Sequence, residues 1–154
     1  MIARQDDKWR LISEMRRRGR TLVKVEGRSM YPTLWNGASL EVHPTAFDEL
    51  EIGDLVVFSD GRGLICHRLL RKSHAVLSLK GDTNLWTDPP IAYEQVLGRV
   101  TRIIDNNLKI TPVDTPRQKR RAALIARFSY PYSLYFTVLN TLGQCRWWAR
   151  SEEI

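Results

Sequence analysis

The chain has 154 residues, enough for one domain of ordinary size with its own core. Its formal net charge of +7 favours an anionic partner, such as nucleic acid, an acidic peptide or an anionic membrane surface. Two cysteines, Cys66 and Cys145, are too few for a disulfide framework. They are most simply free thiols, although the sequence leaves open a disulfide between them.

Residues 1–20 are expected to form a short N-terminal helix. Trp9, Ile12 and Met15 recur at three-residue spacing, which is typical of an amphipathic helix. The stretch is highly charged and has no apolar segment of the kind that a secretory signal contains. It is not expected to be half of a helix-turn-helix motif, because no second helix fits before the strand predicted from Thr21.

Residues 21–110 are expected to form a β-rich domain. Turn signals such as Asn36-Gly37 and Asp60-Gly61 separate its short apolar runs. The runs are Thr21–Val25, Ser39–Val42, Asp54–Phe58, Gly63–Leu70, Ala75–Leu79, Val96–Ile104 and Leu108–Ile110. Many short strands with frequent turns predict a barrel-like or folded antiparallel sheet.

The chain beyond the β-rich region changes in composition. Residues 111–121 contain two prolines and are expected to be a linker. Residues 122–154 are rich in apolar and aromatic side chains and predict helices, with Thr115 as the cap of the first and Pro131 as an interruption.

The segment from Phe128 to Cys145 contains no charged residue and lies near the lower length limit of a membrane span, ~17–25 residues. Its aromatic residues suit the lipid–water interface, and the flanking basic residues suit anionic lipid heads. We expect either a helix that lies on an anionic membrane from the cytoplasmic side, or helices that pack on the β domain or on a second copy of the chain. The expected location is cytoplasmic, peripheral to the membrane in the first case.

The octapeptide from Gly27 to Leu34, Gly-Arg-Ser-Met-Tyr-Pro-Thr-Leu, stands between a β-prone run and a turn. Backbone in such a place can hold Ser29 exposed, as a nucleophile must be. Pro32 stiffens the turn, and Gly27 permits a close backbone approach or a positive φ. The alternative is an ordinary loop in which Met30 fills a gap in the core. The octapeptide alone does not decide between these interpretations.

Four further motifs follow this octapeptide along the chain. They are Ile52-Gly53-Asp54-Leu55-Val56-Val57-Phe58, His67-Arg68, Lys80-Gly81-Asp82-Thr83-Asn84 and Gly98-Arg99-Val100. In this order the five motifs resemble the signal peptidase I superfamily, which includes the self-cleaving LexA-type repressors. The resemblance covers about residues 23–100 and implies a β-rich serine peptidase fold with Ser29 as nucleophile. Ordinary signal peptidases differ from this sequence in having an N-terminal transmembrane anchor.

Cys66-His67-Arg68 stands where one kind of signal peptidase has Lys-Arg. The resemblance is therefore to the Ser/His kind of the endoplasmic reticulum and archaea, and it implies His67 as general base with Arg68 in support. A histidine accepts a proton near neutral pH, whereas a lysine must first be desolvated. The alternative is that His67 is only a core or surface histidine. His43 and His74 match no motif and are expected in solvated loops.

An imidazole base needs a group that holds its tautomer. In the Ser/His kind, the acidic member follows the Gly-Asp pair by six positions, which implies Asp88 as the orienting acid and Asp82 as structural support. Both aspartates also suit turns. Many relatives have a serine hydroxyl where Gly27 stands, so the backbone N–H of Ser29 is the expected oxyanion donor. Cys66 should point away from the His67 imidazole, because neighbours on a strand face opposite sides.

The sequence therefore predicts a mainly β protein with a folded antiparallel sheet or barrel, a short N-terminal helix and C-terminal helices. We predict a serine endopeptidase that cleaves a leader or signal-like peptide, and the family resemblance implies small residues before the cut. The substrate would lie extended beside Thr21–Glu26 or Leu64–Leu70. The alternatives are a LexA-like self-cleaving or DNA-associated regulator, which the positive charge favours, and a catalytically silent peptide-binding module. Nucleic acid is not the expected partner, and the sequence leaves the oligomeric state open.

No metal or cofactor is expected. The spacing of the cysteines and histidines matches no zinc pattern, and the sequence contains no glycine loop that would cradle a phosphate. The predicted site consists of Ser29, His67 and Asp88. Its predicted supporting residues are Gly27, Met30, Pro32, Arg68 and Asp82.

Overall fold

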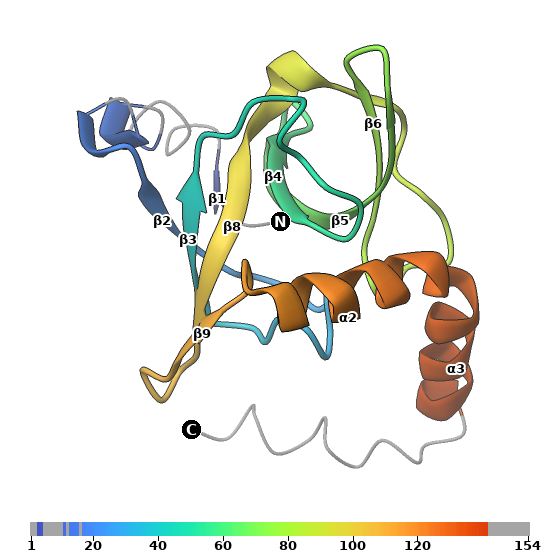
Figure 1. The fold of residues 1–154 in the computed structure, drawn as a ribbon. Helices are drawn as coiled ribbons and strands as arrows, with labels where there is room; N and C mark the ends of the chain where they lie inside the picture. The colour runs from blue at the N-terminus through green and yellow to red at the C-terminus, as the bar shows by residue number, and fades with distance from the viewer. Residues whose placement is uncertain (1–2, 5–10, 12, 16, 142–154) are drawn as a thin grey trace.

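A computed structural model of the chain describes residues 3–4, 11, 13–15 and 17–141 (Figure 1). The described strands form one antiparallel sheet of nine strands that curls on itself. They are β1 (Ala3–Arg4), β2 (Thr21–Lys24), β3 (Ser39–His43), β4 (Leu55–Ser59), β5 (Gly63–Ser73), β6 (Val76–Lys80), β7 (Ile91–Ala92), β8 (Val96–Ile104) and β9 (Ile110–Pro112). The predicted mainly β fold with a folded antiparallel sheet is confirmed.

The sheet runs in the order β2-β3-β8-β4-β5-β6-β7, with β1 paired to β5 and β9 paired to β8. Strand β4 is buried along its whole length, as a central strand covered on both faces should be. Strand β2 instead alternates buried and exposed residues, because it lies at the end of this order and is covered on one face.

The curled sheet separates two apolar cores, and alternate residues of one strand enter different cores. On β4, Val57 lies in the first core and Phe58 in the second. On β5, Cys66 lies in the first core, and the ring of His67 stands 6.1 Å from the ring of Phe58. Cys66 and His67 therefore face opposite sides of β5, as expected from the pleat of a strand.

Two α-helices follow the sheet, α2 (Pro116–Arg127) and α3 (Ser129–Thr141), and a short 3₁₀ turn (Tyr93–Gln95) precedes β8. The linker predicted over 111–121 is wrong in extent, because β9 ends at Pro112 and α2 already begins at Pro116. The predicted cap is confirmed: the Thr115 hydroxyl accepts a hydrogen bond from the backbone N–H of Gln118, and proline suits the first helical position. Pro131 does not interrupt the helices, since it lies in the first turn of α3.

Near the N-terminus, the described residues between Leu11 and Arg18 are helical, which agrees with the predicted short helix. The helix does not extend over all of residues 1–20, because Ala3–Arg4 form a strand against β5. Buried Met15 joins the first core. Trp9 and Ile12 lie outside the described residues.

Helix α2 crosses one side of the curled sheet, and α3 turns away from it (Figure 1). Ala126, Ser129 and Ser133 are buried, so these helices pack on the β domain, which was one of the two expectations for this segment. Within the described part of the chain, no helix has both the length and the apolar character needed to cross a bilayer. Trp147 and Trp148, which favoured membrane binding, lie outside the described residues.

Candidate active site

Three side chains from separate parts of the chain meet in a line. Ser29 stands in the turn region between β2 and β3, His67 on β5, and Asp88 in the loop between β6 and β7. His67 Nε2 lies 3.1 Å from Ser29 Oγ, and His67 Nδ1 lies 2.6 Å from Asp88 Oδ2. The structure thus brings together the three residues predicted as catalytic, in the order hydroxyl, imidazole and carboxylate that general-base activation of serine requires.

Of these three side chains, that of His67 is the most buried. Ser29 is half-buried, and the His67 side chain is 6% exposed. The Asp88 carboxylate, 17% exposed, holds one ring nitrogen, so the other nitrogen is left to face the hydroxyl. When Nδ1 carries the proton and donates it to Asp88, Nε2 has a lone pair to accept the proton of Ser29.

Hydrogen bonds hold the backbone around Ser29. The Tyr31 N–H donates to the Arg28 carbonyl, and both the backbone N–H and the hydroxyl of Thr83 donate to the Ser29 carbonyl. Met30, predicted as a supporting residue, is buried in the first core. One side of the turn is therefore anchored in the core, while Ser29 is held toward His67.

Two glycines shape the backbone around Ser29, Gly81 by its close approach and Gly27 by its positive φ. A Cβ atom on Gly81 would stand 2.8 Å from the Ser29 carbonyl oxygen, which is closer than real Cβ contacts come. Gly27 adopts a φ of 98°, a region that L side chains rarely occupy. A serine at this position would therefore require a different backbone.

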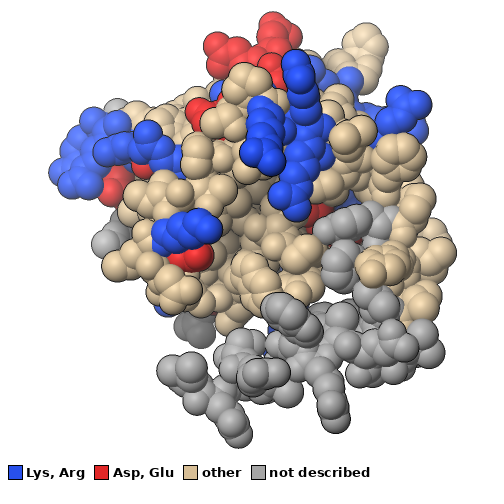
Figure 2. Space-filling view, turned by 60° about the horizontal axis from the view of Figure 1, so that its bottom comes forward, with Lys and Arg blue, Asp and Glu red and all other residues tan. Residues whose placement is uncertain are grey.

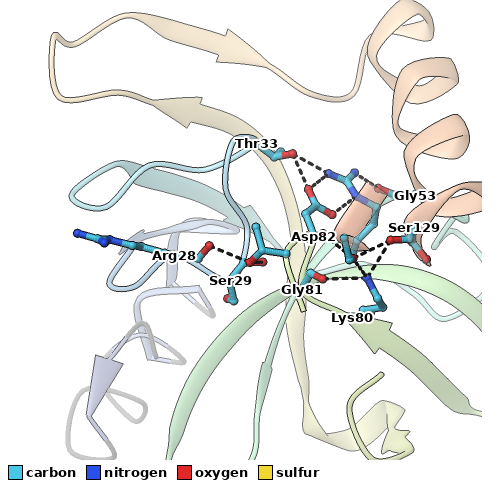
Figure 3. Close-up of polar contacts among 11 residues, drawn as sticks. Arg28, Ser29, Thr33, Gly53, Lys80, Gly81, Asp82 and Ser129 are labelled. Carbon is cyan, nitrogen blue, oxygen red and sulfur yellow. Dashed lines mark hydrogen bonds and ion pairs between the residues drawn. The ribbon is translucent and has the colours of Figure 1, made fainter. Parts of the chain in front are cut away.

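An ion pair sealed from solvent lies beside this line (Figure 3). Arg68 donates from Nε and Nη2 to the two carboxylate oxygens of Asp82, each over 2.7 Å, and these side chains are 3% and 1% exposed. The Thr33 hydroxyl donates to Asp82 and accepts from Arg68. Arg68 also donates to the Gly53 carbonyl. Through Thr33, Gly53 and Asp82, three of the five motifs are thus hydrogen-bonded to Arg68 of the His67-Arg68 motif. Asp82 is therefore a supporting residue that lies outside the Ser29–His67–Asp88 line.

Lys80 is the residue whose role the sequence did not indicate. Its ammonium is buried and donates to the Ser133 hydroxyl over 2.5 Å, to the Ser129 carbonyl over 3.2 Å and to the Gly81 carbonyl over 3.3 Å. Burial lowers the pKa of Lys80. The side chain points toward Ser129 and away from Ser29 (Figure 3), so it links the Gly-Asp motif to α3 rather than to the nucleophile.

The remaining candidates stand apart from the site. His43 was expected in a solvated loop, but it is the last residue of β3. Its Nε2 lies 3.1 Å from a Glu41 carboxylate oxygen. His74 is exposed in the turn between β5 and β6. Burial raises the pKa of the Cys66 thiol to about 12, so this thiol is not a ready nucleophile. Among the described side chains, no cluster of metal-binding residues occurs.

A family model described as Peptidase S24-like matches residues 2–101, about two thirds of the chain. The chain belongs to the Peptidase S24-like family. This membership places it in the LexA and signal peptidase-like superfamily of serine peptidases, as the five motifs predicted. A search of curated proteins and a search of solved structures gave no match. The family match contains Ser29, His67 and Asp88, whereas α2 and α3 lie beyond it.

Proposed function

We propose that this member of the family is a serine endopeptidase of the Ser/His signal peptidase-like kind, which cleaves a leader or signal-like peptide. In this proposal Ser29 is the nucleophile, His67 is the general base and Asp88 orients the imidazole. The observation that carries it is the unbroken chain of contacts from Ser29 Oγ through both ring nitrogens of His67 to Asp88.

The chemistry follows from these contacts. Ser29 Oγ attacks the carbonyl carbon of the scissile bond while His67 Nε2 takes the hydroxyl proton. The backbone N–H of Ser29 donates to the oxyanion as charge develops. The imidazolium then gives its proton to the leaving amine, and an acyl group remains on Ser29. Water, deprotonated by the same imidazole, releases the acyl group and restores the serine.

The free edges of the sheet support a substrate that binds as an added strand. Strand β5 pairs with β1 at Gly63–Leu64 and with β6 from Arg68 onward, on the edge opposite β4. Between them, Ile65–His67 have no strand partner on that edge within the described residues. Strand β2 lies at the end of the sheet order, so its outer edge is also unpaired there. Either edge allows extended backbone to be hydrogen-bonded, and the gap in β5 lies at His67 itself.

A LexA-like self-cleaving regulator is the second candidate, because the family model that matches is the S24-like one and the net charge is positive. In that case the scissile bond belongs to the chain itself. Self-cleavage within one molecule proceeds at a rate independent of protein concentration, whereas cleavage of a separate peptide follows the peptide concentration.

The experiment is a digest of a proteome-derived peptide library, with new peptide ends identified by mass spectrometry. We expect cleavage after small residues by the wild-type protein and none by Ser29→Ala. Circular dichroism of both proteins controls for folding. Equal cleavage by Ser29→Ala, or no cleavage of either the library or the chain itself by folded wild-type protein, would refute the proposed function.

A further inference from the structure

A groove of about 970 Å³ lies between α2, the start of α3 and the strands β5 and β6. Three arginines line it: Arg71 on β5, and Arg120 and Arg127 on α2. Arg120 and Arg127 are seven residues apart, so they lie two turns apart on one face of the helix. Leu70 and Leu124 supply apolar surface between the charges.

The three arginines are exposed, and none of their side chains has a hydrogen bond or an ion pair within the described part of the chain. None of the described residues that line the groove is acidic. On the same helix, Lys119 pairs with Glu51 over 2.9 Å, so a neighbouring basic side chain is neutralised while those of the groove are not. Figure 2 shows several groups of Lys and Arg side chains on the face that it turns forward.

Two residues that line the groove connect it to the candidate active site. Thr87 lines it and immediately precedes Asp88, whose carboxylate contacts His67. Ser129 lines it as well, and the carbonyl of this residue accepts from Lys80 behind the site. The groove is therefore linked to the site through Asp88 on one side and through Lys80 on the other.

We propose that this arginine groove binds acidic side chains of the peptide substrate at fixed positions a few residues from the scissile bond. The inference rests on the proposed function and adds a substrate class, a peptide with Asp or Glu near the cut. Arginine suits this task because its planar fork donates two parallel hydrogen bonds to a carboxylate. A concave groove lined by hydroxyl, apolar and arginine side chains fits an extended peptide better than the flat surface of a membrane.

The first test is the cleavage profile of a proteome-derived library. We expect Asp or Glu to be enriched at one or two fixed offsets from the cut, because an extended peptide advances ~3.3 Å per residue along a rigid protein. The variant with Arg71→Gln, Arg120→Gln and Arg127→Gln should lose this enrichment. On a cleaved peptide that carries Glu at those offsets, its KM should rise roughly tenfold, as expected for several partly exposed ion pairs, with kcat within about twofold. The same peptide with Gln in place of Glu should show no change in KM.

The matched control carries Arg17→Gln, Arg62→Gln and Lys109→Gln, three exposed basic residues outside the groove. It removes the same charge and should leave KM for the Glu peptide unchanged. An equal rise in KM in the control would show that net charge alone matters, which would overturn the groove as a binding site. A cleavage profile without acidic enrichment would also overturn it and would leave the proposed peptidase function intact.

A second test does not depend on cleavage. Fluorescein-labelled Glu and Gln versions of one peptide are titrated with the Ser29→Ala protein, and binding is followed by fluorescence anisotropy. We expect the Glu peptide to bind roughly tenfold more tightly, and the arginine variant to abolish the difference. Equal affinity for the two peptides would overturn the inference even if wild-type protein cleaves nothing. Arginine-dependent binding to phosphatidylglycerol vesicles without any preference for the Glu peptide would also overturn it, in favour of a membrane surface.

Discussion

The two polar networks beside β5 are built from neighbouring residues but differ in access to solvent. His67 turns to one side of the strand and contacts Ser29 and Asp88. Arg68 turns to the other side and contacts Asp82. The Asp88 side chain is 17% exposed, whereas that of Asp82 is 1% exposed.

This comparison shows how the dipeptide His67-Arg68 can serve both reactivity and structure. A reacting hydroxyl and imidazole must be reached by a substrate, so their network is open at Ser29. A buried charge must have its partner at all times, because an unpaired charge in a protein interior is costly. Arg68 accordingly makes two contacts to Asp82 and one each to Thr33 and Gly53. We call the contacts among Ser29, His67 and Asp88 the open network, and those of Arg68 and Asp82 with their neighbours the sealed network. We therefore expect changes in the open network to reduce the rate of cleavage and changes in the sealed network to reduce stability.

The largest expected effect is that of His67→Ala on cleavage. Loss of the base from a serine nucleophile should lower kcat by about 10⁶-fold, since such residues act as a unit. The midpoint of urea unfolding should fall less than in Asp82→Asn, because His67→Ala leaves a cavity but no buried charge without its partner. Rates come from a peptide that wild-type protein cleaves in the library digest. Wild-type activity in a folded His67→Ala protein would break the assignment of the open network.

The second expectation compares two aspartates. Asp88→Asn should lower kcat by roughly 10⁴-fold, because an amide does not hold the same imidazole tautomer, while stability changes little. Asp82→Asn should lower the free energy of unfolding by about 3–5 kcal/mol, because it leaves the buried Arg68 guanidinium without a countercharge. Peptide cleavage and urea unfolding of both variants separate the two effects. The reverse ranking would show that the orienting acid is Asp82.

The sequence predicted much of the open network, and the reason is chemical. Nucleophile, base and acid need particular residue types, and a family motif records their spacing, so Ser29, His67 and Asp88 were named as a set. Their hydrogen-bond contacts agree with that set, and the roles proposed for them remain to be tested by cleavage. The separation of His67 from Cys66 was predicted from the pleat of a strand.

The sealed network was predicted only in outline. Asp82 was expected to be structural, but its partner Arg68 was named without a contact, since sequence order does not show which charges meet across a sheet. The contact between Lys80 and Ser133 had no signal, because Ser133 lies on α3 beyond the family match. Thr115 was correctly predicted as the cap of α2, but the linker was extended over the first turns of this helix because prolines mark both linkers and first helical turns. The arginine groove depends on how α2 lies against β5, which no local pattern records.

The third expectation concerns the attachment of α3 to the sealed network. Ser133 accepts from Lys80 and donates to the backbone carbonyl of Asp82 or of Ser129. Ser133→Ala should lower the free energy of unfolding by about 1–3 kcal/mol, because it leaves buried polar groups short of a partner. Ser129→Ala is the matched control, since Ser129 contacts Lys80 through its backbone carbonyl. An equal loss of stability in the control would show that the Ser133 hydroxyl has no special part.

The smallest expected effect is a pH dependence of stability that originates from Lys80. Burial lowers its pKa below the ordinary value of 10.5, so the folded protein releases this proton at a lower pH than the unfolded chain. Between the two pKa values the unfolded chain binds more protons, and the contribution of Lys80 to stability therefore rises with pH. The charged groups that act on it are Asp82, Asp88 and Arg68.

The measurement is urea unfolding of wild-type protein and Lys80→Met between about pH 8 and pH 10, within the range where a desolvated lysine titrates. The difference in unfolding free energy, wild type minus variant, should increase with pH across this range. Lys109→Met is the control, because Lys109 is exposed and the difference for it should stay constant. Other titrating groups cancel in each difference, since both proteins contain them. A constant or decreasing difference for Lys80→Met would show that burial of the charged Lys80 ammonium does not lower the free energy of unfolding. The sealed network would then tolerate the charge of Lys80 as fully as it does that of Arg68.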